Sequence, residues 1–385
     1  MLPGTNVALG ITGSIAAVKV VELAHELRRQ GATVRGVMSK SATDIIHPWA
    51  VEFATDQPVV TEITGAVEHV SLFGDDGWAD VFVIAPATAN TIGKMAAAID
   101  DTPVTTCATV ALGSGTPVVL APAMHGPMHD HPGVLDAMET LEGWGVAVVD
   151  PIFEEGKAKI ADDETIVLET ARQVGERPLD GKRVVVTSGA TAEPIDPVRV
   201  LTNRASGKTG RAVAKGLYGR GADVTLVHDG PAVPYADVHQ VETADEMRNA
   251  VLDAVAEADA LVSAAAIGDF TTEPEPSKIR SGSERTLELQ PAPKLIDAVR
   301  EAKPDLPIVG FKAESGGASS LEDAARSLQE RVGLVFVVGN DASVMGEDET
   351  SVLIVDGETV ATFEGTKTEL GVRVADELAA RLSDR

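Results

Sequence analysis

Apolar and polar residues follow a recurring pattern near the start of this 385-residue chain. Residues 6–13 form an apolar run that ends in a glycine turn, and residues 32–38 form another. Between them, apolar residues recur at helical spacing up to Gly31: Ile15, Val18, Val21, Ala24 and Leu27. An apolar run, a tight turn and an amphipathic stripe predict a strand, a turn and a helix, followed by the next strand.

The same pattern returns in the second half of the chain. Residues 183–187 and 223–228 are predicted strands, and residues 206–218 are the predicted helix between them. Further short apolar runs bounded by Gly, Pro or Asp are predicted strands: 81–85, 117–121, 146–149, 260–265, 307–311 and 334–338. Repeated strand–helix–strand units predict an α/β protein with two doubly wound, Rossmann-like domains built on parallel sheets.

A polar segment separates the two series of strands and helices. Residues 175–182 contain a proline and two glycines, so we expect one domain at 1–175 and a second at 181–385. Near the end, strands at 351–355 and 358–362 flank Asp356-Gly357, a strong hairpin signal, and a helix is expected at 367–381. The second domain should therefore carry an antiparallel hairpin at the edge of its sheet.

Composition narrows the classes of function. The net charge of −27, from 59 acidic and 32 basic residues spread along the chain, disfavours nucleic acid as a partner. No apolar run reaches the ~18 residues of a membrane span, and no signal-peptide pattern opens the chain, so we expect a cytoplasmic protein. The single cysteine, Cys107, excludes an intrachain disulfide and agrees with a reducing compartment. The acidic field predicts a salt-adapted (halophilic) protein, because salt would screen its repulsion of phosphorylated substrates.

Two features of the first half are candidates for chemistry. The turn at Gly10-Ile11-Thr12-Gly13 departs from the Gly-x-Gly-x-x-Gly fingerprint, which disfavours a nicotinamide cofactor. A small-residue turn that opens a helix presents backbone N–H groups to a phosphate, although a plain strand–helix turn has the same sequence pattern. His69 is a lone histidine between Glu68 and Val70, and a lone histidine is more often structural than catalytic.

Together with segments 85–91, 100–106 and 122–128, these features resemble the flavin-dependent phosphopantothenoylcysteine decarboxylase family. The resemblance implies a flavodoxin-like domain that binds FMN, with Gly13, Ser14 and Ser39 near the phosphate. It places four further residues near the isoalloxazine ring or a neighbouring subunit: Ala85, Thr88, Asn90 and Thr105. It makes His69 the base that accepts a proton while the cysteine moiety loses hydride to the flavin. The resulting thioaldehyde would favour loss of carbon dioxide and leave an enethiolate.

The first half departs from the common family pattern at two positions. His125 stands where most members have asparagine, and the flap at 154–160 has no cysteine, as in archaeal-type members. We expect His125 to bind the substrate carboxylate and Lys157 or Lys159 to help protonate the enethiolate. A zinc site is the competing interpretation of a histidine cluster next to Asp130: His125, His129 and His131. The intervening Gly126-Pro127 and the lack of a second cluster of ligands disfavour zinc.

In the second half, Ser206-Gly207-Lys208-Thr209 mimics the end of a P-loop, but Thr202 occupies the place of its first glycine. Residues 187–203 and Ser206-Gly207 instead resemble the phosphopantothenate-cysteine ligase family, in a loop of about twenty residues. The resemblance implies that Asn203 turns over an acyl-cytidylate and that Lys278 closes over the triphosphate of CTP, with Mg²⁺ as a further cofactor. It implies these CTP contacts: Ser263, Ala264, Ala265, Asp269, Lys278, Pro293, Lys294, Leu295, Ile296 and Phe311. A turn asparagine and a solubilising surface lysine are the plain alternatives for Asn203 and Lys278.

The ligase half also departs from its family. Residues 291–294 read Pro-Ala-Pro-Lys in place of Lys-Asn-Pro-Asp, and the basic residues expected near Leu328 and Val332 are missing. These departures leave the preference for CTP over ATP to the resemblance alone, and the sequence does not identify the ligands of the metal.

Over nearly its whole length the chain resembles bifunctional, archaeal-type members of these families, which make two consecutive intermediates of coenzyme A. The expected partners are 4′-phosphopantothenate, L-cysteine and CTP, in a homo-oligomer of trimeric flavin domains joined by dimeric ligase domains. The alternatives are a catalytically impaired regulatory flavoprotein of the same fold, and a flavin-fold decarboxylase or prenyltransferase with other substrates.

Overall fold

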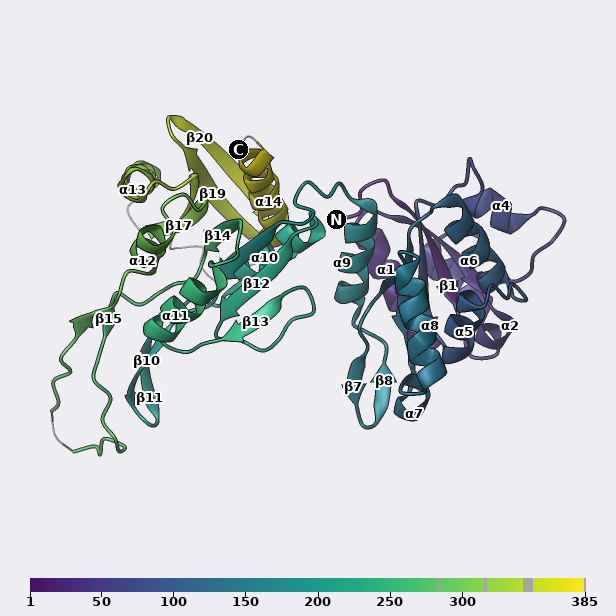
Figure 1. Cartoon of the computed structure of the whole chain (residues 1–385), viewed down its shortest axis with the longest axis horizontal. Coiled ribbons are helices and arrows are strands. Elements are labelled where there is room, and N and C mark those ends of the chain that lie inside the picture. The colour runs from purple at the N-terminus through teal and green to yellow at the C-terminus, as the bar shows by residue number, and fades with distance from the viewer. Residues whose placement is uncertain (283, 315–316, 342–348, 384–385) are drawn as a thin grey trace. The chain divides into compact units, whose positions relative to one another are not determined.

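The computed structural model describes residues 1–282, 284–314, 317–341 and 349–383. The chain forms two compact units, Met1–Gly175 and Glu176–Arg385 (Figure 1). Each unit has its own sheet and its own apolar core.

Unit 1 is built on a five-stranded parallel sheet in the order β2-β1-β3-β4-β6. Its strands are β1 (Asn6–Ile11), β2 (Thr33–Met38), β3 (Val81–Ala87), β4 (Val118–Pro122) and β6 (Ala147–Val148). Its helical segments are η1 (Ile15–Lys19), α1 (Val20–Arg29), α2 (Lys40–Thr43), α3 (Pro48–Thr55), α4 (Glu68–Phe73), α5 (Ala89–Ala96), α6 (Pro103–Ser114), α7 (Gly126–His129), α8 (Pro132–Gly143) and α9 (Asp163–Val174).

Helices cover both faces of this sheet, as alternating side chains along the buried strands require. Val7 and Leu9 of β1 pack with α1, α3 and α9 in one core cluster. Ala8, between them, belongs to the other cluster, which includes side chains of α4, α5, α6 and α8. This order and covering confirm the expected doubly wound, flavodoxin-like fold.

The first helix differs from the sequence expectation in the face that it buries. Ile15 and Val18 are 77% and 57% exposed, whereas Ala17 and Val20 are buried, as are Leu23 and Leu27 further along. The segment begins with the 3-10 turn η1, capped by the Ser14 side chain, and only then continues as α1. Because a 3-10 turn has three residues per turn, the buried stripe is shifted relative to the α-helical spacing.

The flap of unit 1 is a β-hairpin, which the sequence analysis did not predict. Strands β7 (Ile152–Glu154) and β8 (Lys157–Lys159) pair antiparallel, and β8 also pairs with β5 (Met124–His125). Glu155 and Gly156 form the turn with positive φ angles of 52° and 71°. Two successive left-handed residues are typical of the two-residue hairpin turn.

Unit 2 contains an eight-stranded sheet in the order β13-β12-β9-β14-β17-β18-β19-β20. Its strands are β9 (Arg183–Thr187), β12 (Asp223–His228), β13 (Asp237–Gln240), β14 (Ala260–Ser263), β17 (Ile308–Glu314), β18 (Phe336–Asp341), β19 (Glu349–Asp356) and β20 (Thr359–Thr366). The strands from β13 to β18 are parallel, and β19 and β20 add an antiparallel hairpin at the edge. Asp356 pairs with Thr359 across its turn, which confirms the hairpin expected at Asp356-Gly357.

Five helices of unit 2 lie in the part of the chain that the structure describes: α10 (Lys208–Gly219), α11 (Ala244–Ala254), α12 (Leu295–Ala302), α13 (Ala318–Val332) and α14 (Lys367–Ser383). Helices α10 and α14 pack side by side (Figure 1). Glycines permit this approach, because a Cβ on Gly371 would lie 2.0 Å from the Ala212 carbonyl oxygen. Among the described residues, no helix combines the length and apolarity needed to span a bilayer.

Two irregular segments extend from unit 2 near one another. The loop after β9 contains a hairpin, β10 (Ala192–Asp196) and β11 (Arg199–Thr202). The second segment, residues 272–289, leaves from β15 (Phe270–Thr271) and returns at β16 (Gln290–Pro291), which pair with each other. Figure 1 shows this long loop beside the β10–β11 hairpin, and hydrogen bonds described below join them.

Candidate functional site

The candidate flavin site lies at the carboxyl edge of the sheet in unit 1. Gly13 follows β1, Ser39 follows β2 and Thr88 follows β3, so the chain leaves three neighbouring strands at this edge. The buried Thr12 hydroxyl donates to the Pro86 carbonyl oxygen at 2.7 Å and accepts from the Thr88 N–H at 3.1 Å. These bonds tie the turn after β1 to the turn after β3.

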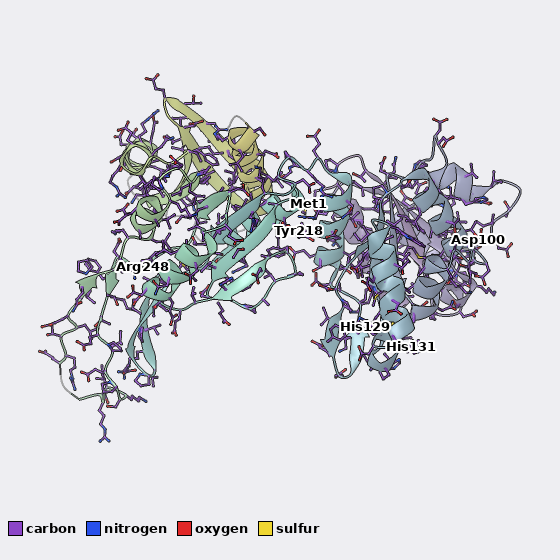
Figure 2. The ribbon with its side chains drawn as sticks, in the orientation of Figure 1. Met1, Asp100, His129, His131, Tyr218 and Arg248 are labelled. Atoms are coloured by element: carbon purple, nitrogen blue, oxygen red, sulfur yellow. The ribbon has the colours of Figure 1, made fainter. Side chains whose placement is uncertain are left out.

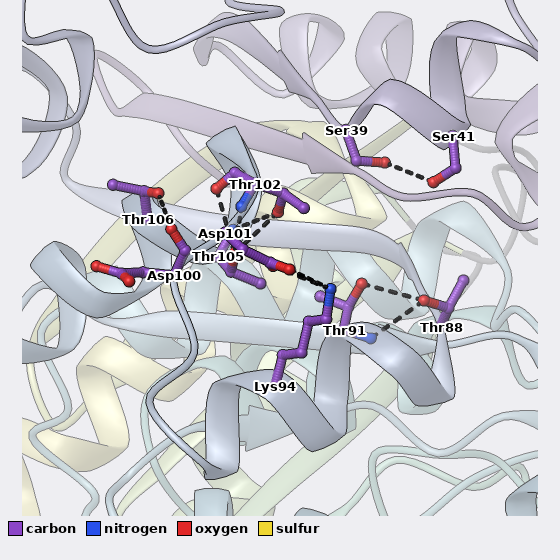
Figure 3. Close-up of polar contacts among 10 residues, drawn as sticks. All are labelled: Ser39, Ser41, Thr88, Thr91, Lys94, Asp100, Asp101, Thr102, Thr105 and Thr106. Carbon is purple, nitrogen blue, oxygen red and sulfur yellow. Dashed lines mark hydrogen bonds and ion pairs between the residues drawn. The ribbon is translucent and has the colours of Figure 1, made fainter.

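Close packing and hydroxyl groups define the inner surface of this edge. A Cβ on Gly13 would lie 2.4 Å from the Ser41 hydroxyl oxygen, so only glycine fits against that side chain. The Ser39 and Ser41 hydroxyls are 3.1 Å apart, and Figure 3 shows this pair in the same region as the pair formed by Thr88 and Thr91. A glycine turn lined with hydroxyls between β1 and β3 fits FMN, because this switch point is where flavodoxin-like folds bind it.

The other predicted flavin contacts differ in exposure and in the hydrogen bonds of their side chains. Ala85 is fully buried in β3, so it presents no exposed atom to a ligand. Asn90 is exposed in the first turn of α5. The Thr105 hydroxyl is used locally, because Thr102 and Thr105 form the capping box of α6 with their hydroxyls 2.9 Å apart. Nearby, Lys94 and Asp101 form an ion pair at 2.8 Å (Figure 3).

His69 lies on the short helix α4, which packs against α6. Its Nδ1 atom is buried and has no hydrogen-bond partner among the described residues. The adjacent Glu68 carboxylate has a pKa below its usual value, chiefly because the Thr64 hydroxyl and N–H donate to it, and also because His69 is near. Figure 1 shows α4 away from the β7–β8 hairpin within unit 1, so one copy of the chain does not bring His69 to the flap.

His125 and Lys157 are brought together by strand pairing. They are opposite one another in the β5–β8 ladder, which places their Cβ atoms roughly 5 Å apart. Lys157 is exposed and takes no part in the ion pairs of the flap. Lys159 instead contacts Glu154 at 2.8 Å and Glu155 at 3.2 Å, and the hydrogen bonds that it donates to these two carboxylates raise its pKa. Of the two flap lysines, Lys157 is therefore the one available to a substrate beside His125.

Cys107 is fully buried on α6. Burial, and secondarily the negative charge of Glu68, raises the pKa of its thiol to about 12. A thiol with that pKa stays protonated near neutral pH and is inert, so Cys107 does not replace the missing flap cysteine.

The remaining histidines of the cluster have structural roles. His131 caps α8 by accepting a hydrogen bond from the Gly133 N–H at 3.1 Å. The His129 ring contacts the edge of Phe153 in β7, with centroids 4.9 Å apart, and Figure 2 shows His129 and His131 on neighbouring turns. Within the described ranges, no three His, Cys, Asp or Glu side chains are grouped as metal ligands.

In unit 2 the predicted ligase residues gather at the carboxyl ends of β9 and β14. The buried Thr187 hydroxyl accepts hydrogen bonds from the N–H groups of Ala264 and Ala265, both at 3.1 Å. The Ala266 N–H donates to the Gly189 carbonyl oxygen, and Asn203 Nδ2 donates to the Ala266 carbonyl oxygen at 2.9 Å. The structure thus brings Asn203 from the end of β11 to the segment 264–266.

The second group of predicted nucleotide contacts adjoins this segment. Asp269 forms an ion pair with Lys294 at 2.8 Å, and its carbonyl oxygen accepts from the Ala292 N–H. Three side chains are turned partly or fully into the protein: Ser263 and Leu295, which are buried, and Ile296, which packs against the core. Pro293 and Phe311 are partly exposed.

Lys278 is exposed on the loop 272–289, and two buried carboxylates that the sequence analysis did not single out hold this loop. Glu193 and Asp196 on β10 are 5% and 3% exposed. Glu193 accepts from the Thr271 hydroxyl at 2.8 Å, and Asp196 accepts from the Ile279 N–H at 3.0 Å. The sequence signal that could have indicated the buried Asp196 is its place between an apolar residue and a proline, in Ile195-Asp196-Pro197.

Comparison with known families agrees with the division into two units. Residues 1–175 match the Flavoprotein family, and residues 179–382 match the family described as DNA/pantothenate metabolism flavoprotein C-terminal domain. The second match alone covers more than half of the chain.

Relatives and solved structures are similar to the whole chain or to one unit. The Coenzyme A biosynthesis bifunctional protein CoaBC of Thermococcus kodakarensis is 48% identical over 99% of this chain and 96% of its own length. A crystal structure of the C-terminal domain of a CoaBC protein covers 55% of this chain and 100% of its own, with 28% identity and a TM-score of 0.46. A crystal structure of the FMN-dependent cysteine decarboxylase SpaF covers 44% and 99%, with 30% identity and a TM-score of 0.39.

The identity to a bifunctional relative over the full length of both chains is decisive, because the two halves occur together and in the same order. The chain belongs to the CoaBC family of bifunctional coenzyme A biosynthesis proteins.

Proposed function

We propose that this chain joins 4′-phosphopantothenate to L-cysteine in unit 2 and decarboxylates the product, phosphopantothenoylcysteine, to 4′-phosphopantetheine in unit 1. As a CoaBC protein it is a bifunctional enzyme, a carboxy-lyase and a carbon–nitrogen ligase. One observation supports the finer assignment: Gly13, Ser39 and Thr88 follow strands at the carboxyl edge of the parallel sheet of unit 1, and Asn203 is bonded to segment 264–266 at the corresponding edge of unit 2. Ligands of open α/β sheets bind at that edge.

In the ligase reaction, the carboxylate of phosphopantothenate attacks the α-phosphate of CTP. An acyl-cytidylate forms and pyrophosphate leaves; the amine of cysteine then displaces CMP. Charge develops on phosphoryl oxygens, so we assign Lys278 and Mg²⁺ to stabilising that charge. Asn203, held at the Ala266 carbonyl, is in reach of an acyl group bound beside segment 264–266.

In the decarboxylase reaction, FMN supplies the reversible two-electron oxidation of the cysteine moiety when it is bound at the Gly13 turn. We assign to His69 the acceptance of the substrate proton, which suits an imidazole near neutral pH. His125 holds the substrate carboxylate until carbon dioxide leaves. Lys157, opposite His125, donates a proton to the enethiolate that remains.

The separation of α4 from the flap supports the expected oligomer. We propose that flavin units form trimers in which a second copy completes each centre, and that ligase units form dimers. The single cysteine agrees with a reducing compartment, and we propose the cytoplasm. The net charge of −27 supports salt adaptation.

The experiment that tests the function uses purified protein reconstituted with FMN. Phosphopantothenoylcysteine is supplied, and loss of carbon dioxide is followed by product mass, beside the visible flavin spectrum. We expect the wild type to be yellow and to decarboxylate, and His69→Asn to stay yellow but to lose this activity. A yellow wild type that leaves phosphopantothenoylcysteine intact would instead support the regulatory flavoprotein, and a colourless protein that refuses FMN would contradict both.

A further inference from the structure

Asp196 is a buried carboxylate at the end of β10 that receives four hydrogen bonds. Its side chain has no solvent exposure, and both of its oxygens are used. Oδ1 accepts from the N–H groups of Val198 and Arg199, at 2.8 and 2.9 Å. Oδ2 accepts from Arg199 Nη1 at 2.9 Å and from the Ile279 N–H at 3.0 Å. The last of these bonds joins residues that are 83 positions apart in the sequence.

Both backbone polar groups of Ile279 are held by this cluster. Asp196 accepts a hydrogen bond from the Ile279 N–H, and Arg199 Nη2 donates to the Ile279 carbonyl oxygen at 3.2 Å. The loop is joined to β10 once more upstream, where the Glu275 N–H donates to the Ile195 carbonyl oxygen at 2.9 Å. The contacts to Ile279 are therefore the ones nearest to Lys278, which directly precedes it.

The same hairpin positions Asn203. Strand β11 pairs with β10, and Asn203 follows β11, where its amide donates to Ala266. Thr202 adds a bond from its hydroxyl to the Thr191 carbonyl oxygen at 2.9 Å. Lys278 and Asn203 come from distant parts of the sequence, yet the β10–β11 hairpin fixes the place of both.

We propose that Asp196 is a positioning residue of the ligase, which acts through Ile279 to hold Lys278 over the bound nucleotide. This inference rests on the proposed function of unit 2 and adds a residue to it. Charge-assisted hydrogen bonds are shorter and stronger than neutral ones, and a fully used carboxylate leaves the attached backbone little freedom. We call the hydrogen bonds of Asp196 and Arg199 to Ile279 the clamp. A displacement of about 1 Å in a catalytic group can cost ~10²-fold in rate, so a clamp that fixes the position of Lys278 should affect the rate of the ligase reaction.

Glu193 offers a matched control on the same strand. It is equally buried, and it accepts from the Ala244 N–H and the Thr271 hydroxyl, both at 2.8 Å. These bonds secure the base of the loop and the start of α11, but they do not reach the neighbours of Lys278. If the buried carboxylates of β10 have a purely structural role, Glu193→Gln and Asp196→Asn should lower the rate of pyrophosphate release by similar factors.

The test is a double-mutant cycle on pyrophosphate release with the full-length protein. Asp196→Asn removes the charge and turns an amide donor toward the N–H groups, and we expect kcat to fall about 10- to 100-fold. If Asp196 acts through Lys278, adding Asp196→Asn to Lys278→Met costs no further activity. Hydrogen exchange of the Ile279 amide should be faster in Asp196→Asn than in Glu193→Gln. Decarboxylation by unit 1 should be unchanged in both variants.

Additive losses in the double variant, or equal losses in Glu193→Gln, would overturn the proposal. If Asp196→Asn does not fold, Arg199→Met enters the same cycle, because it removes the bonds from Arg199 to the Ile279 carbonyl and to Asp196 and leaves the Asp196 carboxylate in place. With Arg199→Met, too, non-additivity supports the clamp and additivity refutes it. A wild type that releases no pyrophosphate from CTP would refute the function of unit 2 instead, and the two failures are therefore distinguishable.

Discussion

The two units each present a lysine on an extended segment, but they hold it in different ways. Lys157 lies in strand β8, whose backbone pairs with β5 and β7 on both sides. Lys278 lies in a loop without a strand partner, and the side chain of one buried residue, Asp196, holds the next backbone group. The position of Lys157 therefore depends on main-chain pairing, whereas the position of Lys278 depends on a few side chains.

This difference shows where single substitutions can act. The ion pairs of Lys159 in the flap are solvent-exposed, with side chains 35%, 60% and 75% exposed, and such pairs contribute about 0–1 kcal/mol. Their removal should leave the ladder and Lys157 in place. The Asp196 carboxylate is buried, and its loss leaves backbone donors without partners.

The largest effect is expected from Lys278→Met. If the lysine stabilises the charge that develops on the phosphoryl groups, pyrophosphate release should fall about 10²- to 10³-fold. Arg280→Met, two residues away on the same exposed loop, is the matched control and should stay within about threefold. Stopped-flow measurement of pyrophosphate compares the two. If both substitutions lowered pyrophosphate release equally, any positive charge on the loop would serve, and Lys278 would have no specific role.

A smaller effect is expected from the flap. Lys157→Met should lower decarboxylation about 10²-fold, the contribution of a general acid, whereas Lys159→Met should change it by less than about threefold. Mass spectrometry of the product should also detect the unreduced enethiol with Lys157→Met. A greater loss with Lys159→Met would reverse the assignment of the two lysines.

Salt should affect both units, because the excess of acidic residues is spread along the whole chain. Raising KCl from 0.1 to 2 M shortens the Debye length from about 10 Å to less than about 3 Å, and should lower KM for phosphorylated substrates several-fold. The measurement is KM for each half-reaction against KCl, with circular dichroism to follow the fold. Full activity at low salt with an intact fold would refute salt adaptation.

The smallest effect concerns Cys107, which lies in the core of unit 1 and on neither lysine-bearing segment. Its pKa is raised to about 12 in the folded state, chiefly by burial, so its contribution to stability is complete below the pKa of an unfolded thiol and is lost as the pH rises toward 12. Between pH 9 and 11 this slope is at most ~1.4 kcal/mol per pH unit. Denaturant unfolding of the wild type should therefore lose more stability over that range than Cys107→Ala. Parallel curves for the two proteins would exclude the thiol as the cause.

Much of the scaffold could be predicted from the sequence, because buried parallel strands, amphipathic helices and an Asp-Gly hairpin have local signals. The spacing of Ile15 and Val18 predicted that both residues face the core, and this prediction was wrong because a 3-10 turn changes which residues are buried. The sequence around Asp196 marks the carboxylate but not its role, because its partner Ile279 is 83 positions away and is reached only through the fold. The choice between Lys157 and Lys159 likewise required the register of the β5–β8 ladder, which a sequence pattern does not define.

The central claim is that one chain performs both steps. The most direct measurement supplies the wild type, loaded with FMN, with 4′-phosphopantothenate, L-cysteine, CTP and Mg²⁺, and follows all products by mass. We expect pyrophosphate, CMP and carbon dioxide to appear together with 4′-phosphopantetheine, and His69→Asn to stop at phosphopantothenoylcysteine with pyrophosphate release intact. A wild type that forms no phosphopantothenoylcysteine, or that accumulates it without forming 4′-phosphopantetheine, would contradict this claim.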